Sequence, residues 1–449
     1  MALAVNLYGW LARNSLISNQ FHRLPYRWQL YCILQYWNVL YHRRKRGWYW
    51  CDNQLSSFPC WGGQRKGRVS VVLPVYNHAA TVAQAIESVL QQGYPDIELI
   101  VVNDGSTDET SDILADYENR REVTVINQSN CRLPTALNRG FRAATGEFLT
   151  WTSADNLMHP HQLEQLVSYL QDHRDVAVVY ADFALIDEDA QPVRSAAACL
   201  MRGEAGTPVV RPRREADRLN IGYECVVGPC FLYRSFLPRL IGPYNPQLEG
   251  SEDFDYWIRI HNFFPVRHLG SREPLYQYRL AGDRMSVRLK DRVRTLRRWL
   301  MEREQQFQQR LTLPVLVAVD AISMDKLAPI SGRDNRLPRL TFYRIDAQSS
   351  SFDMLPQAFL LEATLANMPI IKAIKPSLSQ PLILWCNTPI QDDRLSDIAA
   401  QADLLIIVSC DQSSSLSNSL RAASIRDMYE LVRIFIGSVI NATMLPWPV

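Results

Sequence analysis

The chain has 449 residues, 47% hydrophobic and 21% charged, which is the composition of an ordinary folded protein with two or three domains. The net charge is +2, but the charges are unevenly distributed. Residues 1–68 contain ten Lys or Arg and one acid, Asp52, so their charge is +9 and that of the remaining residues is −7. The pattern indicates a basic N-terminal segment facing an anionic surface and excludes a chain that binds nucleic acid throughout.

The nine cysteines are odd in number and scattered, and none forms a Cys-x-x-Cys pair. They indicate reduced thiols, with neither a disulfide framework nor a zinc site. The sequence shows no signal peptide and no run of about eighteen uncharged apolar residues. We therefore expect a cytoplasmic protein without a transmembrane helix.

Residues 1–67 form a basic segment that holds six of the eleven tryptophans. Apolar residues recur at helical spacing between Tyr26 and Tyr41, and the basic cluster Arg43–Arg46 follows at once. Residues 26–46 thus predict an amphipathic helix at an anionic membrane surface, which would make the protein peripheral on the cytoplasmic face. A helix packed on the next domain explains the pattern equally well.

Strands and helices alternate over residues 68–285, which predicts an α/β domain with a mainly parallel sheet and helices on both faces. The expected strands are Val69–Leu73, Leu99–Val102, Val123–Ile126, Glu147–Trp151, Val176–Tyr180, Phe183–Ile186, Gly228–Tyr233 and Pro274–Arg279. The expected helices are Thr81–Gln92, one that begins near Glu109, Leu133–Ala144, His159–Leu170 and Glu252–Ile260. The arginine-rich stretch Gln191–Asn220 predicts a long loop, either a lid or a solvated loop.

Residues 286–314 contain a heavily charged helix, Ser286–Arg310, which is expected to be an exposed connector or lever between domains. Residues 315–449 predict a smaller C-terminal α/β domain of unknown role. Its expected strands are Val315–Val319, Leu340–Ile345, Leu382–Trp385 and Leu404–Val408, and its expected helices are Leu355–Leu365, Asp392–Ala402 and Leu416–Ile440. No glycine-rich phosphate loop follows these strands, so structural packing is favoured over a nucleotide site.

Three segments of the first domain run from a strand into polar residues: Val71–Asn77, Ile100–Asp108 and Gly146–Asn156. Each alone could be turn chemistry, but ligands bind at the carboxyl ends of strands in open α/β sheets. Together with Gly250–Trp257, these segments resemble glycosyltransferase family 2. The resemblance covers residues 68–286 approximately and implies the GT-A fold, a nucleotide-sugar donor and an inverting transfer.

The resemblance implies a nucleotide-binding role for five residues. Pro74, Tyr76 and Asp104 match positions near the base and ribose, where Asp104 would accept hydrogen bonds from a uracil or ribose. Asn138 and Arg139 lie in a segment that is similar to the family's nucleotide-side helix. A UDP-sugar is the favoured donor.

The same resemblance implies a divalent metal ion, Mg²⁺ or Mn²⁺. Ser153-Ala154-Asp155 stands where the family has Asp-x-Asp, so Asp155 is expected to bind the metal and Ser153 to contact the ribose or a metal-bound water. Ser153 carries no charge, which puts the strength of metal binding in question. Arg279 matches a basic position near the donor diphosphate.

The segment Gly250–Trp257 looks like the family's Glu-Asp motif at the mouth of the acceptor site. Asp253 matches the catalytic base, and Glu252 and Trp257 are expected to contact substrate. A simpler interpretation is that two acids at a helix start complement the helix dipole. One base without a covalent nucleophile corresponds to inverting displacement.

The sequence therefore predicts an inverting glycosyltransferase that moves a sugar to a saccharide or lipid-linked acceptor, in cell-surface polysaccharide biosynthesis. The alternative is an inactive GT-A module that binds nucleotide sugar or scaffolds an assembly, which Ser153 favours and Asp253 opposes. A nucleotidyltransferase would need a glycine-rich basic loop after the first strand, and Pro74–Ala80 is not one.

Overall fold

The computed structural model describes residues 64–193, 207–212, 219, 225–280, 289–310, 315–331, 340–344, 358–362, 381–386, 402–408, 419–422 and 424–443. The expected membrane helix 26–46, most of Gln191–Asn220 and nearly all of the expected helix Asp392–Ala402 lie outside these residues. No helix within them is long and apolar enough to cross a membrane.

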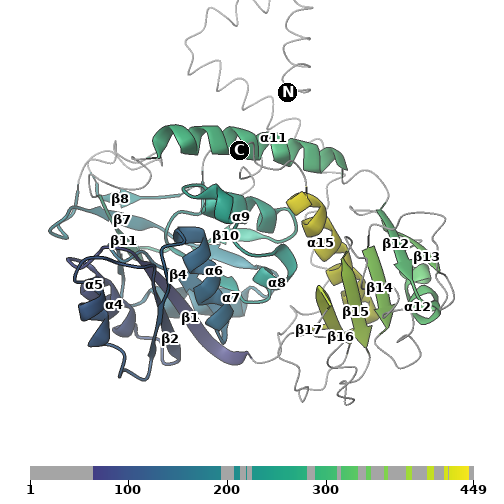
Figure 1. The fold of residues 1–449 in the computed structure, drawn as a ribbon, viewed down its shortest axis with the longest axis horizontal. Helices are drawn as coiled ribbons and strands as arrows, with labels where there is room; N and C mark the ends of the chain where they lie inside the picture. Colours follow the sequence, from purple (N-terminus) through teal and green to yellow (C-terminus); the bar gives the residue numbers. More distant parts are fainter. Residues whose placement is uncertain are drawn as a thin grey trace, which may run out of the picture.

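A seven-stranded sheet forms the centre of the first domain (Figure 1). β9 runs antiparallel to both of its neighbours, and every other neighbouring pair is parallel, so the expected mainly parallel sheet is confirmed. In spatial order its strands are β10 (Val266–His268), β6 (Val178–Tyr180), β9 (Phe231–Arg234), β4 (Gly146–Trp151), β1 (Arg65–Val75), β2 (Ile97–Asn103) and β3 (Val123–Asn127).

Helices cover both faces of this sheet because β1 and β2 are buried on both sides. One apolar cluster contains Val69 and Val71 of β1 together with residues of α4 (Val82–Leu90), α5 (Thr110–Ala115) and α7 (Gln162–Asp172). The other contains Val72 together with residues of α6 (Leu133–Ala143), α8 (Leu237–Ile241) and α9 (Glu252–His261). Gly140 lets α6 approach closely, since a Cβ there would lie 2.4 Å from Cγ1 of Val72.

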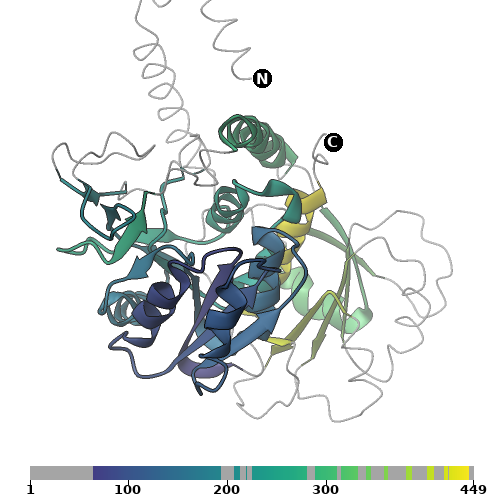
Figure 2. The ribbon, with the colours of Figure 1, turned by 60° about the vertical axis from the view of Figure 1, so that its left-hand side comes forward.

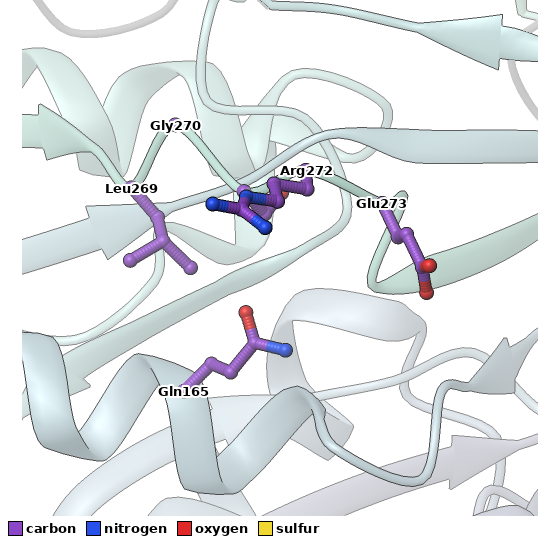
Figure 3. A pocket seen from close by; sticks show the side chains of 6 residues that line it. Gln165, Leu269, Gly270, Arg272 and Glu273 are labelled. Carbon is purple, nitrogen blue, oxygen red and sulfur yellow. The ribbon is translucent and has the colours of Figure 1, made fainter.

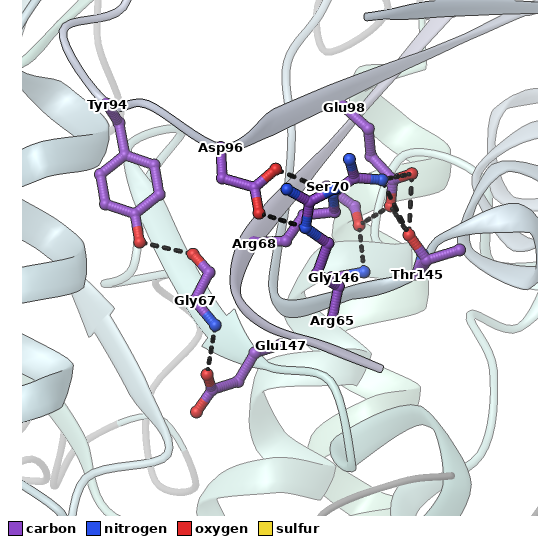
Figure 4. Close-up of polar contacts among 10 residues, drawn as sticks. All are labelled: Arg65, Gly67, Arg68, Ser70, Tyr94, Asp96, Glu98, Thr145, Gly146 and Glu147. Carbon is purple, nitrogen blue, oxygen red and sulfur yellow. Dashed lines mark hydrogen bonds and ion pairs between the residues drawn. The ribbon is translucent and has the colours of Figure 1, made fainter. Parts of the chain in front are cut away.

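A network of ion pairs closes the amino-terminal edge of the sheet (Figure 4). Arg68 contacts Asp96 at 3.1 Å and Glu98 at 3.2 Å. Glu98 in turn accepts a hydrogen bond from the backbone N of Thr145 at 2.6 Å, which ties β1, β2 and the start of β4 together. The charged side chains at this edge therefore have a structural role, which is to connect neighbouring strands.

A smaller four-stranded sheet lies beside the large one, with the order β5 (Leu157–Met158), β11 (Tyr276–Arg279), β7 (Phe183–Ile186) and β8 (Val209–Val210). β11 pairs parallel with β7 and antiparallel with β5. Since β5 follows the Ser153–Asn156 segment directly, this pairing connects that segment to β11.

The C-terminal part is a six-stranded, entirely parallel sheet. Its order is β13 (Leu340–Arg344), β12 (Val315–Val319), β14 (Ala358–Glu362), β15 (Leu382–Cys386), β16 (Leu404–Val408) and β17 (Ser419–Ala422), and its helices are α12 (Ala321–Ser331) and α15 (Ile425–Thr443). The expected α/β class is therefore confirmed for this part as well.

Two element predictions in the C-terminal part are wrong. Leu355–Leu365 was expected to be helical, but its described residues form β14, a buried strand between β12 and β15. A short apolar run does not distinguish a buried strand from a helix. Leu416–Ile440 was expected to be one helix, but β17 precedes α15, and Ser424 caps α15 by accepting a hydrogen bond from the N of Asp427 at 3.1 Å.

The charged helix α11 (Lys290–Arg310) crosses above α9 in Figure 1 and is not exposed on all sides. Val293, Leu296, Leu300 and Phe307 on one face of it are buried. α15 contacts α8, α11 and its own sheet, and one apolar cluster runs from the large sheet through α15 into the C-terminal sheet (Figure 2). The two α/β parts are therefore packed together, although the expected boundaries between them stay a prediction.

Candidate active site

The carboxyl ends of β1, β2 and β4 meet at one edge of the large sheet. Val75 is paired with Asn103, and Val72 with Trp151. The backbone N of Asp104 donates to the carbonyl of Val75 at 2.8 Å. Three of the predicted segments, those that contain Pro74–Tyr76, Asp104 and Ser153–Asp155, are consequently brought together by adjacent strands.

Asp104 is the buried carboxylate of this edge, with 4% of its surface exposed. Its Oδ1 accepts hydrogen bonds from Nε2 of Gln128 at 2.7 Å and from the N of Cys131 at 2.8 Å. Gly105 follows at φ +76°, and a Cβ there would lie 2.8 Å from the N of Asn130, so only glycine fits. Both of these hydrogen bonds go to Oδ1 of Asp104. Tyr76, which follows β1, is 45% exposed.

The turn after β2 also serves as a local cap. The carboxylate of Asp108 accepts hydrogen bonds from the N of Ala79 at 3.1 Å and from the N of Thr110 at 3.0 Å. Asn77, at φ +55°, accepts from the N of Thr107 at 2.7 Å. These bonds fix the loops on either side of Asp104.

Arg279 supports the segment that contains Asp155. Its backbone N donates to Oδ1 of Asn156 at 2.8 Å, and its Nε donates to the carbonyl of Asp155 at 2.8 Å. The guanidinium also donates to the carbonyls of Asp187 and Glu188 and to the side chain of Gln84, and only 3% of the residue is exposed. These contacts make Arg279 a structural support, and its expected contact with a diphosphate stays a prediction.

The residues expected to contact a metal ion, Ser153 and Asp155, follow β4. Ser153 and Asp155 are both half-buried. Within the described part of the chain, no group of three or more His, Cys, Asp or Glu side chains could hold a metal. Hard oxygen atoms of Asp155 and Ser153 suit Mg²⁺ or Mn²⁺, but such an ion would need most of its ligands from a diphosphate and water.

Glu252 and Asp253 begin α9, after the N-cap residue Ser251 and Gly250, which has φ +87°. The N of Gly250 donates to Oε2 of Glu252 at 2.6 Å, and the N of Phe254 donates to Oδ1 of Asp253 at 2.6 Å. The thiol of Cys225 donates to Oδ2 of Asp253 at 3.7 Å. Glu252 is buried, with 4% exposed, whereas Asp253 is half-buried and keeps access to solvent.

The two neighbouring carboxyl groups differ in their electrostatic surroundings. Burial, and then the charge of Asp253, raise the pKa of Glu252 to about 8. Burial also raises the pKa of Asp253, but the positive charge of Arg297 opposes that rise. Burial thus favours the protonated form of both acids, and Asp253 is the one for which a neighbouring cation opposes that effect.

An ion pair connects this helix start to the nucleotide-side loops. Nη1 of Arg132 lies 3.4 Å from both carboxylate oxygens of Glu249. Arg132 follows Cys131, whose N binds Asp104. The contacts from Asp104 through Cys131 and Arg132 to Glu249 therefore place the start of α9 at the same edge of the sheet as the strand ends.

The side chains of Trp257 and Asn138 are buried and contact other parts of the protein. Trp257 is fully buried, and its ring packs edge-on against Phe231 with centroids 4.7 Å apart, so a packing role replaces the expected substrate contact. Nδ2 of Asn138 donates to the carbonyl of Tyr244 at 2.7 Å and its Oδ1 accepts from the N of Tyr244 at 2.9 Å. Arg139 is exposed on α6.

Sequence reasoning missed Arg132, Glu249 and Arg297. Arg132 has φ +72°, a backbone conformation that residues other than glycine rarely adopt, and nothing in the neighbouring sequence predicts it. Arg297 lies on α11, about forty residues beyond Asp253, and no motif surrounds it. Arg132 and Arg297 are both placed by tertiary contacts, which the spacing of residues along the sequence does not reveal.

Two hollows, of about 450 and 480 Å³, lie away from this edge, between α7 and the loop after β10. Figure 3 shows Gln165 of α7 pointing toward the loop that carries Leu269 and Arg272. None of the predicted site residues lines either hollow.

Comparison with known proteins agrees with this geometry. The model of the family "Glycosyl transferase family 2" matches residues 70–238. The putative glycosyltransferase EpsE of Bacillus subtilis is 37% identical over 222 residues, which are 48% of this chain and 74% of EpsE. The chain belongs to glycosyltransferase family 2.

An uncharacterized glycosyltransferase of Rickettsia typhi is 32% identical over 200 residues, 42% of this chain and 58% of that relative. The chain thus spans little more than half the length of this family member. Among solved structures, Staphylococcus aureus TarS 1-349 in complex with UDP is 20% identical with a TM-score of 0.39, covering 52% of this chain and 65% of TarS. Mannosyltransferase PcManGT of Pyrobaculum calidifontis, in complex with GDP-Man and Mn²⁺, is 20% identical with a TM-score of 0.37, covering 57% and 67%.

Proposed function

We propose that this family 2 member is an inverting glycosyltransferase that transfers a sugar from a UDP-sugar to a saccharide or lipid-linked acceptor, in cell-surface polysaccharide biosynthesis. One observation carries the proposal: Asp104 and the Glu252–Asp253 pair lie at one edge of the sheet, joined through Cys131, Arg132 and Glu249. An acceptor-activating base beside a nucleotide-binding edge is what direct displacement at a sugar carbon requires.

Asp253 is the proposed base. This residue is half-buried, and its carboxylate accepts the proton of the acceptor hydroxyl as that oxygen attacks the anomeric carbon, while the nucleoside diphosphate leaves from the opposite side. Attack from one side and departure from the other invert the configuration. Glu252, held neutral by burial, adds no second negative charge beside the base.

Asp104 is the proposed nucleotide contact, and its Oδ1 is held in place by Gln128 and the N of Cys131. Asp155 and Ser153 would hold a divalent metal ion, whose chemistry would be to neutralise the charge of the leaving diphosphate. Arg279 keeps the Asp155 segment in place through the carbonyl of Asp155 and the side chain of Asn156.

The test is a panel of UDP- and GDP-sugars, with donor hydrolysis and transfer to simple glycosides as readouts. Asp253→Asn should lower the transfer rate about 10²–10⁴-fold, since it removes the base and keeps the shape. UDP binding, measured by calorimetry, should persist in this variant. Transfer by Asp253→Asn at the normal rate would refute the base assignment.

The metal has its own test. Excess chelator and Asp155→Ala should each abolish transfer, and Mn²⁺ should bind more tightly in the presence of UDP than in its absence. Full activity under chelation, together with an active Asp155→Ala, would leave the diphosphate charge to the arginines.

A second candidate is an inactive module that binds nucleotide sugar, because Ser153 replaces a carboxylate at the expected metal position. It predicts UDP-sugar binding without turnover for every member of the panel. Association of residues 26–46 with an anionic membrane on the cytoplasmic face remains a further proposal, which vesicle co-sedimentation at low and high salt tests.

A further inference from the structure

We infer that Arg297 of α11 is a positioning residue that keeps Asp253 the negatively charged member of the Glu252–Asp253 pair. The inference rests on the proposed function, because it concerns the base of that reaction. Arg297 lies beyond residues 70–238, which the family model matches, and outside every motif that the sequence provides.

α11 is fixed to the helix that carries the base. Arg303 of α11 donates to the carboxylate of Asp255, which is completely buried. The next residue of α11, Glu304, accepts a hydrogen bond from Nδ2 of Asn262, the C-cap residue of α9, at 3.0 Å. The buried face of α11 therefore has a defined register against α9, which determines where Arg297 lies.

Arg297 lies on this inner face of α11, between the buried residues Leu296 and Leu300. Its guanidinium carbon is 5.3 Å from the ring centroid of Phe254, the residue that follows Asp253. The side chain is half-buried, so its charge is screened less than that of an exposed arginine. From this position the charge of Arg297 acts on the carboxyl group of Asp253 and opposes the rise of its pKa.

The groups that face Asp253 come from four elements. Glu252 precedes it on α9, the thiol of Cys225 donates to it from the preceding loop, and Tyr244 approaches from the loop after α8. Glu249 acts indirectly, by raising the pKa of Glu252. Among these groups Arg297, on α11, supplies the positive charge that opposes the effect of burial on Asp253.

This charge matters for a base that must be ionised to act. Burial favours the protonated acid, and a protonated Asp253 cannot accept the proton of an acceptor hydroxyl. Without Arg297, the Glu252–Asp253 pair would stay protonated up to a higher pH. The reaction would then lose rate at neutral pH and regain it in alkali, a pattern that loss of folding would not produce.

The experiment compares Arg297→Gln with Arg297→Lys and with Arg298→Gln. Arg298 is the next residue of the same helix and is exposed, so its variant removes an equal charge from the outer face. The readout is the pH profile of kcat/KM, measured as UDP release from UDP-N-acetylglucosamine or from whichever UDP-sugar the donor panel shows to be turned over. UDP affinity is measured in parallel by calorimetry.

In Arg297→Gln the acid limb of the profile should move up by about one pH unit or more, so that the rate below the limb falls about tenfold and recovers above it. UDP affinity should not change. Arg297→Lys keeps the charge and should keep the limb, and Arg298→Gln should match the unaltered protein. If Arg297→Gln does not fold, Arg297→Met is used instead, because its unbranched side chain still packs against Phe254 without a charge.

An unmoved acid limb in the uncharged variant overturns the inference, whether the rate is normal or uniformly reduced. So does a limb in Arg297→Lys that is displaced as far as in Arg297→Gln. Asp253→Asn separates this outcome from failure of the proposed function. If Asp253→Asn is inactive while the limb does not move, only the role of Arg297 is lost, whereas a fully active Asp253→Asn removes the base itself.

Discussion

At the scale of single residues, the start of α9 places two adjacent carboxyl groups in unlike surroundings. Glu252 is buried and accepts a hydrogen bond from the N of Gly250, whereas Asp253 is half-buried and lies near Arg297. Two titratable groups whose environments separate their pKa values are a recurrent feature of acid–base sites. The burial of Glu252 has a cost that can be measured as stability.

Glu252→Gln should make the protein more stable at alkaline pH. The pKa of Glu252 is about 8 in the folded chain, against 4.5 for an unperturbed glutamate, so the folded state holds a proton that the unfolded state releases between these values. Stability from this group is therefore present at low pH and is lost as pH rises through that window. Urea unfolding at pH 5 and pH 8 should show a flatter pH dependence for the variant, with a gain of at least about 1 kcal/mol at pH 8. An unchanged slope would contradict the burial of an ionisable Glu252.

Arg132 has a strained backbone conformation and also forms an ion pair with Glu249, and substitutions should distinguish the two effects on stability. At φ +72° a side chain costs on the order of 1–3 kcal/mol, while the partly exposed pair with Glu249 contributes about 1 kcal/mol or less. Arg132→Gly should therefore be at least as stable as the unaltered protein, and Arg132→Ala should be less stable than Arg132→Gly by about 1 kcal/mol. Urea unfolding measures both, with the exposed Arg139→Ala as a control for loss of charge. Equal stabilities of the glycine and alanine variants would argue against the strain.

The sequence predicted site roles for Asp104, Asp155 and Asp253 because each stands in a motif at the end of a strand or the start of a helix. It did not identify Arg132 or Arg297, because a positive φ and a contact between α11 and α9 leave no local pattern. It also misassigned Trp257, which belongs to the same motif as Asp253 but turns inward on α9 to pack against Phe231.

At the scale of elements, α9 is held by a buried triad. Asp255 accepts a hydrogen bond from Nε of Arg259 at 2.9 Å and another from Arg303 of α11. Arg259 also donates to the carbonyls of Ile241 and Pro243, which fixes α9 to the end of α8. Although burial alone would raise it, these two arginines hold the pKa of Asp255 below its ordinary value.

Asp255→Asn should be strongly destabilising, because it leaves two buried guanidinium groups without an anion. Breaking a buried ion network by removing one partner costs about 3–5 kcal/mol. Replacing all three residues together, as Asp255→Leu with Arg259→Met and Arg303→Met, should cost much less, since no charge then stays buried unpaired. Urea unfolding of the two variants makes the comparison, and a triple variant as unstable as Asp255→Asn would show that packing rather than charge is responsible.

Element prediction succeeded where the hydrophobic period was long or where a turn bounded a strand. β1 to β4 and α6 lie within a few residues of their expected bounds, because polar or turn-forming residues follow each buried run. β14 was mistaken for a helix because Ala358–Glu362 is a short apolar run without period. β17 was absorbed into α15, although Ser424 followed by Asp427 marks the true helix start.

At the scale of the whole molecule, the charged helix α11 and the long helix α15 join two sheets that sequence reasoning treated as separate domains. Buried residues of α15, such as Leu431 and Val432, belong to the same apolar cluster as Tyr256 of α9 and Trp385 of β15. Through this continuity the C-terminal sheet supports α9, the helix that carries the proposed base. Composition and charge did not predict it, because contacts between distant segments are not periodic in sequence.

The final prediction concerns cooperativity. A boundary that buries a continuous apolar cluster should unfold together with the cores it joins, so the described parts should open as one unit and not as two. In native-state hydrogen exchange, amides of β2 and of β15 should share the same highest opening free energy and the same dependence on denaturant. As a control, Arg298→Gln on the exposed face of α11 should leave both values unchanged. Replacing Leu431, a fully buried residue of α15, by Ala should cost about 2–5 kcal/mol and should lower the opening free energies of β2 and β15 equally. If Leu431→Ala lowered only the value for β15, the C-terminal sheet would be an independent domain, and its contact with α8 and α11 would contribute little to the placement of Asp253.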